Sequence, residues 1–238
     1  MSRRRVVAIF RKEMREFRRN KQVISTMALS PVGFLVFPVI FLFAVPASDA
    51  STLYQYPVLL FTLALAALVP VVVGAYSITG EREQGTLEPV LGTPVLAGEF
   101  LLGKALAVFV PAAAESYLLF GVIDGLVWVL RPAAVSAAAL RPLVLLAQLI
   151  FTPLLAWMGV WISMTISARV SDARVAQQLG WLIMLPVIAL SVLFGFHVLQ
   201  VTALLGVIVG AVLVVLDAAG LSVVSAAFDR ERLVLGTR

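Results

Sequence analysis

The sequence predicts an all-α, polytopic membrane protein with six transmembrane helices and an N-terminal amphipathic helix at the membrane surface. Of its 238 residues, 61% are hydrophobic and 13% are charged, whereas a soluble domain is usually about 45–50% apolar and about 25% charged. The apolar residues form blocks long enough to cross a bilayer as helix, which takes about 20 residues. Nine of the 18 Lys and Arg residues lie within the first 21 positions, directly before the first apolar block.

The first segment, residues 1–22, has the pattern of an interfacial helix. Apolar residues recur at three- and four-residue spacing, and Glu13 is the one polar residue in that series. Arginines and lysines cover the remaining faces. We expect this helix to be held by buried apolar area and by anionic lipid headgroups. It is either a topology signal alone or a lever that links a cytoplasmic partner to the first span.

Six apolar blocks form the predicted transmembrane domain, residues 23–225. Their bounds are 23–45, 57–79, 105–126, 143–166, 179–199 and 201–224. Each must be helical, because lipid offers no hydrogen bonds to open backbone groups. Several spans contain proline, which packed membrane helices tolerate.

The distribution of basic residues predicts the orientation. With the N-terminus in the cytoplasm, sixteen of the 18 Lys and Arg residues are cytoplasmic, and only Arg131 and Arg141 are outside. This bias is typical of the positive-inside rule. We therefore expect a multi-pass protein of the cell (cytoplasmic) membrane with both termini, including a tail at 226–238, in the cytoplasm. The basic residues flank the membrane, so we expect no nucleic-acid partner.

The cytoplasmic loop at 80–104 is unusually acidic. It holds four of the chain's 13 acidic residues, which are Glu81, Glu83, Glu88 and Glu99. Gly85 can end the helix that leaves the second span. Thr86 can cap a new short helix, with Pro89 in its first turn and Leu87 on its apolar face. A charged segment with an apolar knob is suited to a groove on another protein, although a solvated loop remains the alternative.

Two strings in the sequence resemble a known family. EREQGTLEPVLGTPVLAGEFLLGKALA, residues 81–107, is similar to the loop of type-2 ABC exporter permeases, with its E-x-E-x-G-T-L-E element, proline turn and glycine–lysine pair. SARVSDARVAQQLG, residues 167–180, resembles their second cytoplasmic loop. The six-span layout and the basic amphipathic start also agree with that family.

The resemblance implies the permease subunit of an ATP-binding-cassette exporter, which forms the translocation path. Two such permeases, identical or different, would pair, and each would dock on a separate ATPase subunit that binds ATP and magnesium. By this analogy the chain is not an enzyme and holds no cofactor. The implied contacts with the ATPase subunit are Glu81, Arg82, Glu83, Gly85, Thr86, Leu87 and Glu88. The sequence does not indicate the substrate.

Composition also excludes several kinds of chemistry. The chain has no cysteine and one histidine, so we expect no metal site of Cys or multiple His ligands and no thiol catalysis. Residues 98–105 fit G-x-x-x-x-G-K, but Ala105 stands where Ser or Thr should hold magnesium and no strand precedes them. Neither H-E-x-x-H nor G-x-S-x-G occurs, which disfavours an intramembrane enzyme.

Three acidic residues fall inside the predicted spans: Glu115, Asp124 and Asp217. A charge at the bilayer centre costs about 2.5–3.5 kcal/mol on insertion scales. These acids therefore either clamp helices together or line a wet path, and the second case favours the alternative function, a proton- or cation-coupled secondary transporter. Gly206 and Gly210 form a G-x-x-x-G pattern, which allows close helix packing.

Overall fold

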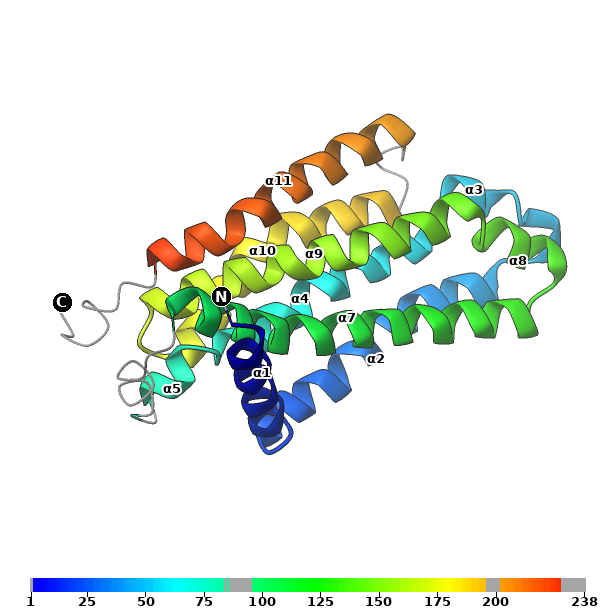
Figure 1. Cartoon of the computed structure of the whole chain (residues 1–238). Helices are drawn as coiled ribbons and strands as arrows, with labels where there is room; N and C mark the ends of the chain where they lie inside the picture. Colours follow the sequence, from blue (N-terminus) through cyan, green and yellow to red (C-terminus); the bar gives the residue numbers. More distant parts are fainter. Residues whose placement is uncertain (1, 84, 86–95, 196–201, 228–238) are drawn as a thin grey trace.

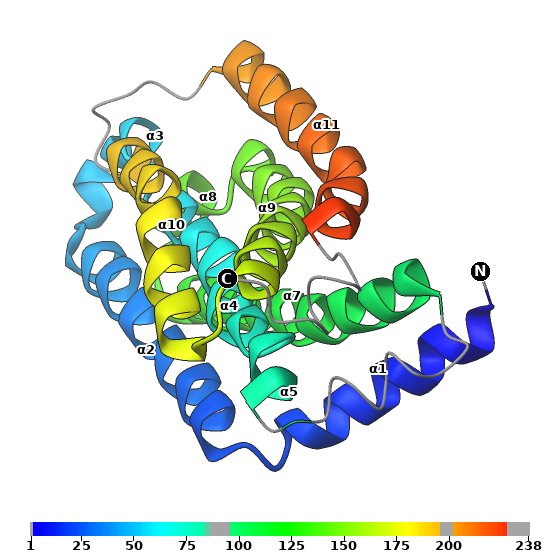
Figure 2. The same cartoon turned by 90° about the vertical axis from the view of Figure 1, so that its left-hand side faces the viewer.

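The computed structural model describes residues 2–83, 85, 96–195 and 202–227. Within these ranges the regular elements are all helices, which confirms the predicted all-α class. Figures 1 and 2 show a bundle of long helices lying side by side, with α1 (Arg3–Phe17) running across one end of it. The long helices are α2 (Lys21–Ala44), α4 (Leu63–Ala75), α7 (Ala97–Leu130), α9 (Pro142–Arg169), α10 (Ala173–Gly195) and α11 (Ala203–Ala227).

Five helical segments are long and apolar enough to cross a membrane. They are Val23–Ala44, Val58–Glu81, Ala97–Leu130, Pro142–Arg169 and Ala203–Ser225. The helix α10 has 23 residues but is not among these five. The chain is therefore a multi-pass membrane protein, and the predicted count of six crossings stays a prediction.

The second predicted span, 57–79, is not one continuous helix. It consists of the 3-10 helix η2 (Val58–Thr62), α4, a turn at residues 76–78, and α5 (Thr79–Glu83). Helix α7 already begins at Ala97, so residues 97–104 of the predicted cytoplasmic loop are helical. The Glu99 carboxylate accepts a hydrogen bond from the Leu96 backbone N–H at 3.4 Å, which caps the first turn of this helix.

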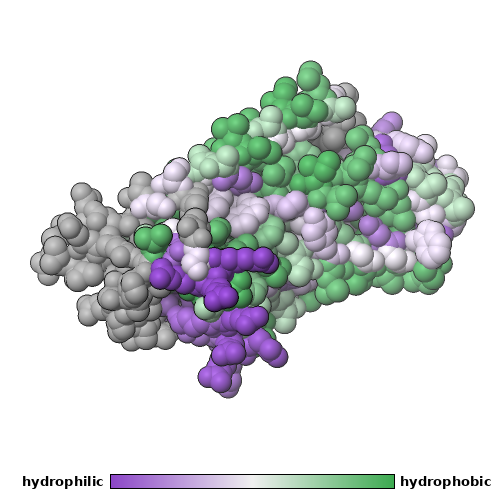
Figure 3. All heavy atoms as spheres, viewed as in Figure 1, coloured by the Kyte–Doolittle hydropathy of each residue, from purple (hydrophilic) through white to green (hydrophobic). Residues whose placement is uncertain are grey.

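The core of the bundle is α4, in which every residue is buried. This helix has no polar face, so it can be surrounded on all sides by other helices. At Gly159 of α9, an added Cβ would lie 2.6 Å from the Ala67 carbonyl oxygen of α4. Only glycine allows this close approach. By contrast, few residues of α2 and α11 are buried, and Figure 3 shows hydrophobic side chains over much of the molecule. Lipid covers such surface in a membrane.

Among the described residues, the G-x-x-x-G pair does not mark a close contact between helices. A Cβ added to Gly206 would meet no atom within 4 Å, and one added to Gly210 would touch the Phe151 ring at an ordinary 3.8 Å. The close approach of α11 to α9 is instead at Gly220, against Trp161. Glycine spacing shows where backbones can approach, but the packing of the whole bundle decides which face meets a neighbour.

Short helices cover the opposite end of the bundle from α1 (Figure 1). These are η1 (Ala47–Asp49), α3 (Thr52–Gln55) and α8 (Ala133–Ala139). There Arg131 donates a hydrogen bond to the Val45 carbonyl, and its guanidinium lies 5.4 Å from the Phe43 ring centre. The basic residues predicted to be outside thus lie far from α1.

Candidate functional site

The amphipathic N-terminal helix predicted from sequence is confirmed as α1, but its inner face packs on protein. Val6, Glu13 and Phe17 are buried. A Cβ added to Gly103 of α7 would lie 2.7 Å from the Ile9 side chain, so this glycine lets the two helices meet closely. Protein thus covers most of this apolar face, with Ile9, Phe10 and Met14 partly buried, and the predicted interfacial position of the helix stays a prediction.

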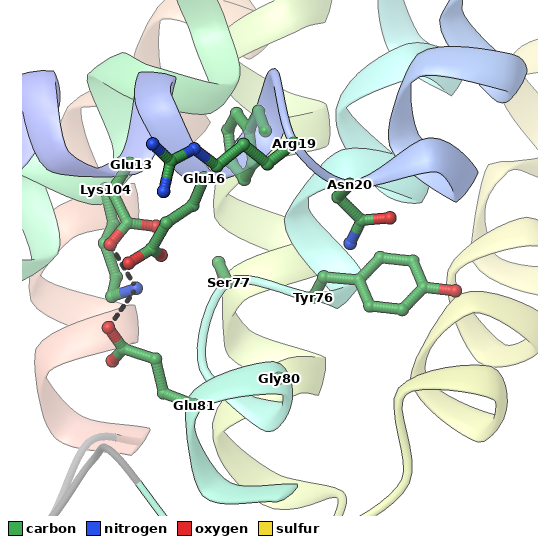
Figure 4. A pocket seen from close by; sticks show the side chains of 10 residues that line it. Glu13, Glu16, Arg19, Asn20, Tyr76, Ser77, Gly80, Glu81 and Lys104 are labelled. Atoms are coloured by element: carbon green, nitrogen blue, oxygen red, sulfur yellow. Dashed lines mark hydrogen bonds and ion pairs between the residues drawn. The ribbon is translucent and has the colours of Figure 1, made fainter. Parts of the chain in front are cut away.

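Beneath α1 lies a buried ion-pair network, shown in Figure 4. Lys104 of α7 is 1% exposed, and its Nζ lies 2.9 Å from Glu13 Oε1 and 3.2 Å from Glu81 Oε1. Lys12 pairs with the same two carboxylates, at 3.2 Å from Glu13. We call Lys12, Glu13, Glu81 and Lys104 the charged joint. It connects α1, α5 and α7, which are far apart in sequence.

The charges of the joint stabilise one another. A buried ammonium is costly unless it is paired and hydrogen-bonded, and Lys104 has two carboxylates and the Phe100 ring, 5.1 Å away, around it. Burial lowers the pKa of Lys12, but its neighbours Glu13, Glu81 and Glu16 outweigh this effect, and the pKa of Lys12 lies well above its usual value. Lys12 is therefore charged throughout the physiological range.

A second contact fixes the start of α1 against the start of α7. The Glu99 carboxylate, 1% exposed, accepts a hydrogen bond from the Ser2 backbone N–H at 2.5 Å and lies 3.3 Å from the Arg5 guanidinium. The two ends of α1 are thus held to α7 by separate ion pairs.

A serine of α9 closes the break between α4 and α5. Ser167 Oγ donates a hydrogen bond to the Ala75 carbonyl at 2.9 Å and accepts from the N–H groups of Ile78 and Thr79 at 3.1 and 3.0 Å. Breaking a helix leaves such groups without their normal partners. One buried hydroxyl therefore satisfies both sides of the break and ties α5 to the end of α9.

Next to the joint is a cavity of about 370 Å³. Its lining includes Glu16, Arg19 and Tyr76 as well as residues of the joint (Figure 4). Carboxylate oxygens of Glu13, Glu16 and Glu81 lie within 4.8 Å of one another, which is close enough for a metal ion. However, each of these carboxylates already pairs with the ammonium group of Lys12 or Lys104, so the arrangement is that of an ion-pair network.

The structure describes part of the predicted contact loop. The side chain of Glu81 is turned inward to the joint and is 5% exposed. Gly85, after the end of α5, has a φ of +66°, which confirms the predicted glycine stop. Arg82 and Glu83 are helical, but their side chains lie outside the description, as do Thr86, Leu87 and Glu88 entirely.

The three intramembrane acids do not come together. Glu115 of α7 accepts a hydrogen bond from Ser30 Oγ of α2 at 2.7 Å, as expected of a polar clamp between helices. One carboxylate oxygen of Asp124 and both of Asp217 have no hydrogen-bond partner in the described part of the chain. The prediction that Glu115 and Asp124 form no paired site is consistent with these contacts.

The sequence analysis did not identify Glu13, Lys104 and Ser167 as site residues. The sequence did contain one indication for Glu13, which is the only polar residue on the apolar face of α1. A carboxylate on a buried face needs a partner of opposite charge, so a buried ion pair could have been predicted there. Lys104 was assigned to a loop, and Ser167 carries no chemical signature. The nucleotide-loop match at residues 98–105 lies inside α7, and a helix cannot wrap around phosphates as that loop does.

Comparison with known proteins supports the assignment to a family. No curated protein sequence matches the chain. The family model described as ABC-2 type transporter matches residues 4–195 of the 238. The match takes in α1, the charged joint and the helices from α2 to α10. The chain therefore belongs to the ABC-2 type transporter family, as an ABC transporter permease.

Proposed function

We propose that this permease serves an exporter and is driven by a separate ATPase subunit that docks on the loop between α5 and α7. The observation that carries the proposal is the charged joint. The two helices that flank the loop are held to each other and to α1 by Lys104, with Nζ–O distances of 2.9 and 3.2 Å. A force on the loop would therefore move three elements together.

The joint and Ser167 define how such a force would spread. A shift of α5 would reach α7 through the Glu81–Lys104 ion pair and α1 through the Lys104–Glu13 ion pair. Because α1 leads into α2, the shift would then reach the first span. Ser167 would carry the same shift to α9. This is the rigid-body kind of change by which packed helices switch between two arrangements. In a pair of permeases it would open the central path to one side and then to the other.

Glu81 has a different role in this proposal from the one its sequence motif implies. Its carboxylate pairs with Lys12 and Lys104, so it anchors α5 and does not itself meet the ATPase subunit. We assign the contact to the rest of the motif, which is Arg82, Glu83, Gly85, Thr86, Leu87 and Glu88. ATP and magnesium would be bound by the partner subunit.

Cysteine cross-linking tests the proposal cleanly, because the chain has no cysteine of its own. Leu87→Cys, treated with a bifunctional thiol reagent in native membranes, is expected to cross-link to a nucleotide-hydrolysing subunit. Ala134→Cys, at an exposed position of α8 at the far end of the bundle, is the matched control and should give no such product. An impermeant thiol reagent applied to intact cells should label Ala134→Cys and not Leu87→Cys. The reverse labelling would refute the cytoplasmic location.

The second candidate is a secondary transporter that uses the intramembrane acids. It is favoured by Asp217, whose two carboxylate oxygens have no hydrogen-bond partner among the described residues. In that case the purified chain in vesicles would transport along a pH gradient without nucleotide, and Asp217→Asn would stop it. Nucleotide-dependent transport that survives Asp217→Asn would exclude this candidate.

A further inference from the structure

Four arginines, three of them in α1 and one at its C-terminal cap, form one stripe along the exposed side of this helix. They are Arg4, Arg11, Arg15 and Arg18, and all four are exposed. At about 100° per residue they lie within about 60° of one another around the helix, and they lie roughly opposite the buried face of Val6 and Glu13. In the described part of the chain none of the four forms an ion pair, whereas Lys12 and Arg5, on other sides of α1, do. Figure 3 shows the hydrophilic side chains that project from this end of the molecule.

The geometry of α1 on α7 sets the direction of the stripe. The inner face of α1 packs on the flank of α7 at Gly103, and α7 runs along the bundle (Figures 1 and 2). The opposite face therefore points away from the bundle, and with the long helices crossing the bilayer as predicted it points sideways in the plane of the membrane. From Gly103 to Arg131 the helix rises about 42 Å, and a bilayer with its headgroups is about 40–45 Å thick. If α7 crosses the bilayer over this length, the stripe lies at the depth of one headgroup layer.

We propose that this stripe, Arg4, Arg11, Arg15 and Arg18, binds the phosphate groups of anionic lipids in the leaflet next to α1. Guanidinium groups bind phosphate through paired hydrogen bonds, and a row of basic residues near an anionic leaflet adds affinity residue by residue. Because protein covers most of the apolar face of α1, we expect charge to supply most of the contact of this helix with lipid. The ATPase subunit of the proposed function would approach along the bundle axis, beyond α5, and not from the side to which the stripe points.

The test is lipid binding by the purified full-length chain in neutral detergent. Dioleoylphosphatidylglycerol is titrated in, with dioleoylphosphatidylcholine as the neutral probe, and native mass spectrometry counts the bound lipids. For Arg11→Gln/Arg15→Gln we expect a loss of phosphatidylglycerol affinity of about 25-fold, at roughly fivefold per arginine. The control is Arg169→Gln/Arg174→Gln, which removes two exposed arginines near the turn between α9 and α10. It should change the affinity less than about threefold.

Three outcomes would overturn the proposal. The first is equal phosphatidylglycerol affinity in the two double variants. The second is an equal loss for both lipids, which would mean a general change in the protein surface. The third is that Arg11→Gln/Arg15→Gln keeps its affinity for phosphatidylglycerol but loses the cross-link to the ATPase subunit. That result would mean that the stripe binds the ATPase subunit and not lipid. Arg4→Gln/Arg18→Gln, in the same stripe, should reproduce the loss, and the thermal unfolding temperature should stay within about 2 °C because all four residues are exposed.

Discussion

Removing the buried ammonium of the charged joint is the sharpest test of how α1 is held. Lys104→Met keeps the volume of the side chain but leaves Glu13 and Glu81, which are 3% and 6% exposed in their side chains, without their closest buried partner. Breaking a buried ion pair typically costs about 3–5 kcal/mol. We expect the low end, about 3 kcal/mol, because Lys12 still contacts both carboxylates.

The assay is thermal unfolding of the purified protein, followed by tryptophan fluorescence. For a chain of this length about 3 kcal/mol corresponds to a fall of about 6–12 °C in the unfolding temperature. Lys12→Met is the control, since it removes an ammonium from the same carboxylates but from a side chain that is 42% exposed. It should cost less than about 1 kcal/mol.

A rescue variant separates charge from packing. Lys104→Met combined with Glu13→Gln and Glu81→Gln leaves no unpaired buried charge at the joint, so it should recover at least half of the loss. The reasoning would be refuted if Lys104→Met were no more harmful than Lys12→Met, or if the neutral triple variant were as unstable as the single one.

Three further substitutions test the packing around the site. Ser167→Ala removes the hydroxyl that accepts hydrogen bonds from two buried backbone N–H groups. It should lower the free energy of unfolding by about 2–4 kcal/mol, measured as a fall in unfolding temperature. A change under about 1 kcal/mol would mean that the break between α4 and α5 does not depend on these hydrogen bonds. Gly159→Ala places a methyl group 2.6 Å from a carbonyl oxygen and should destabilise by about 1–3 kcal/mol. At Gly206 an added Cβ lies more than 4 Å from every described neighbour, so Gly206→Ala should change the unfolding temperature of the isolated subunit little. A fall in unfolding temperature as large as that of Gly159→Ala would contradict the described packing.

Much of the fold was predictable because the bilayer imposes strong constraints on sequence. Long apolar blocks must be helices, and basic residues must cluster on one side. The amphipathic periodicity of α1 and the end of the helix before Gly85 could also be predicted, since each depends on neighbouring residues alone. The break at residues 76–78 was not, because the apolar sequence runs through it and its hydrogen bonds are completed by Ser167, about ninety positions later.

Sequence patterns were enough to establish the all-α class, the membrane character and the resemblance that the family match confirms. They did not show that Glu81 faces inward, that Lys104 is the buried centre of the charged joint, or that α1 packs its inner face on α7 and exposes four arginines on the opposite side. The difference lies in the distance along the chain over which each feature is formed. Hydrophobic blocks and helical periods are local properties of the chain, whereas an ion pair between residues 13, 81 and 104 exists only once three separate helices have been packed together.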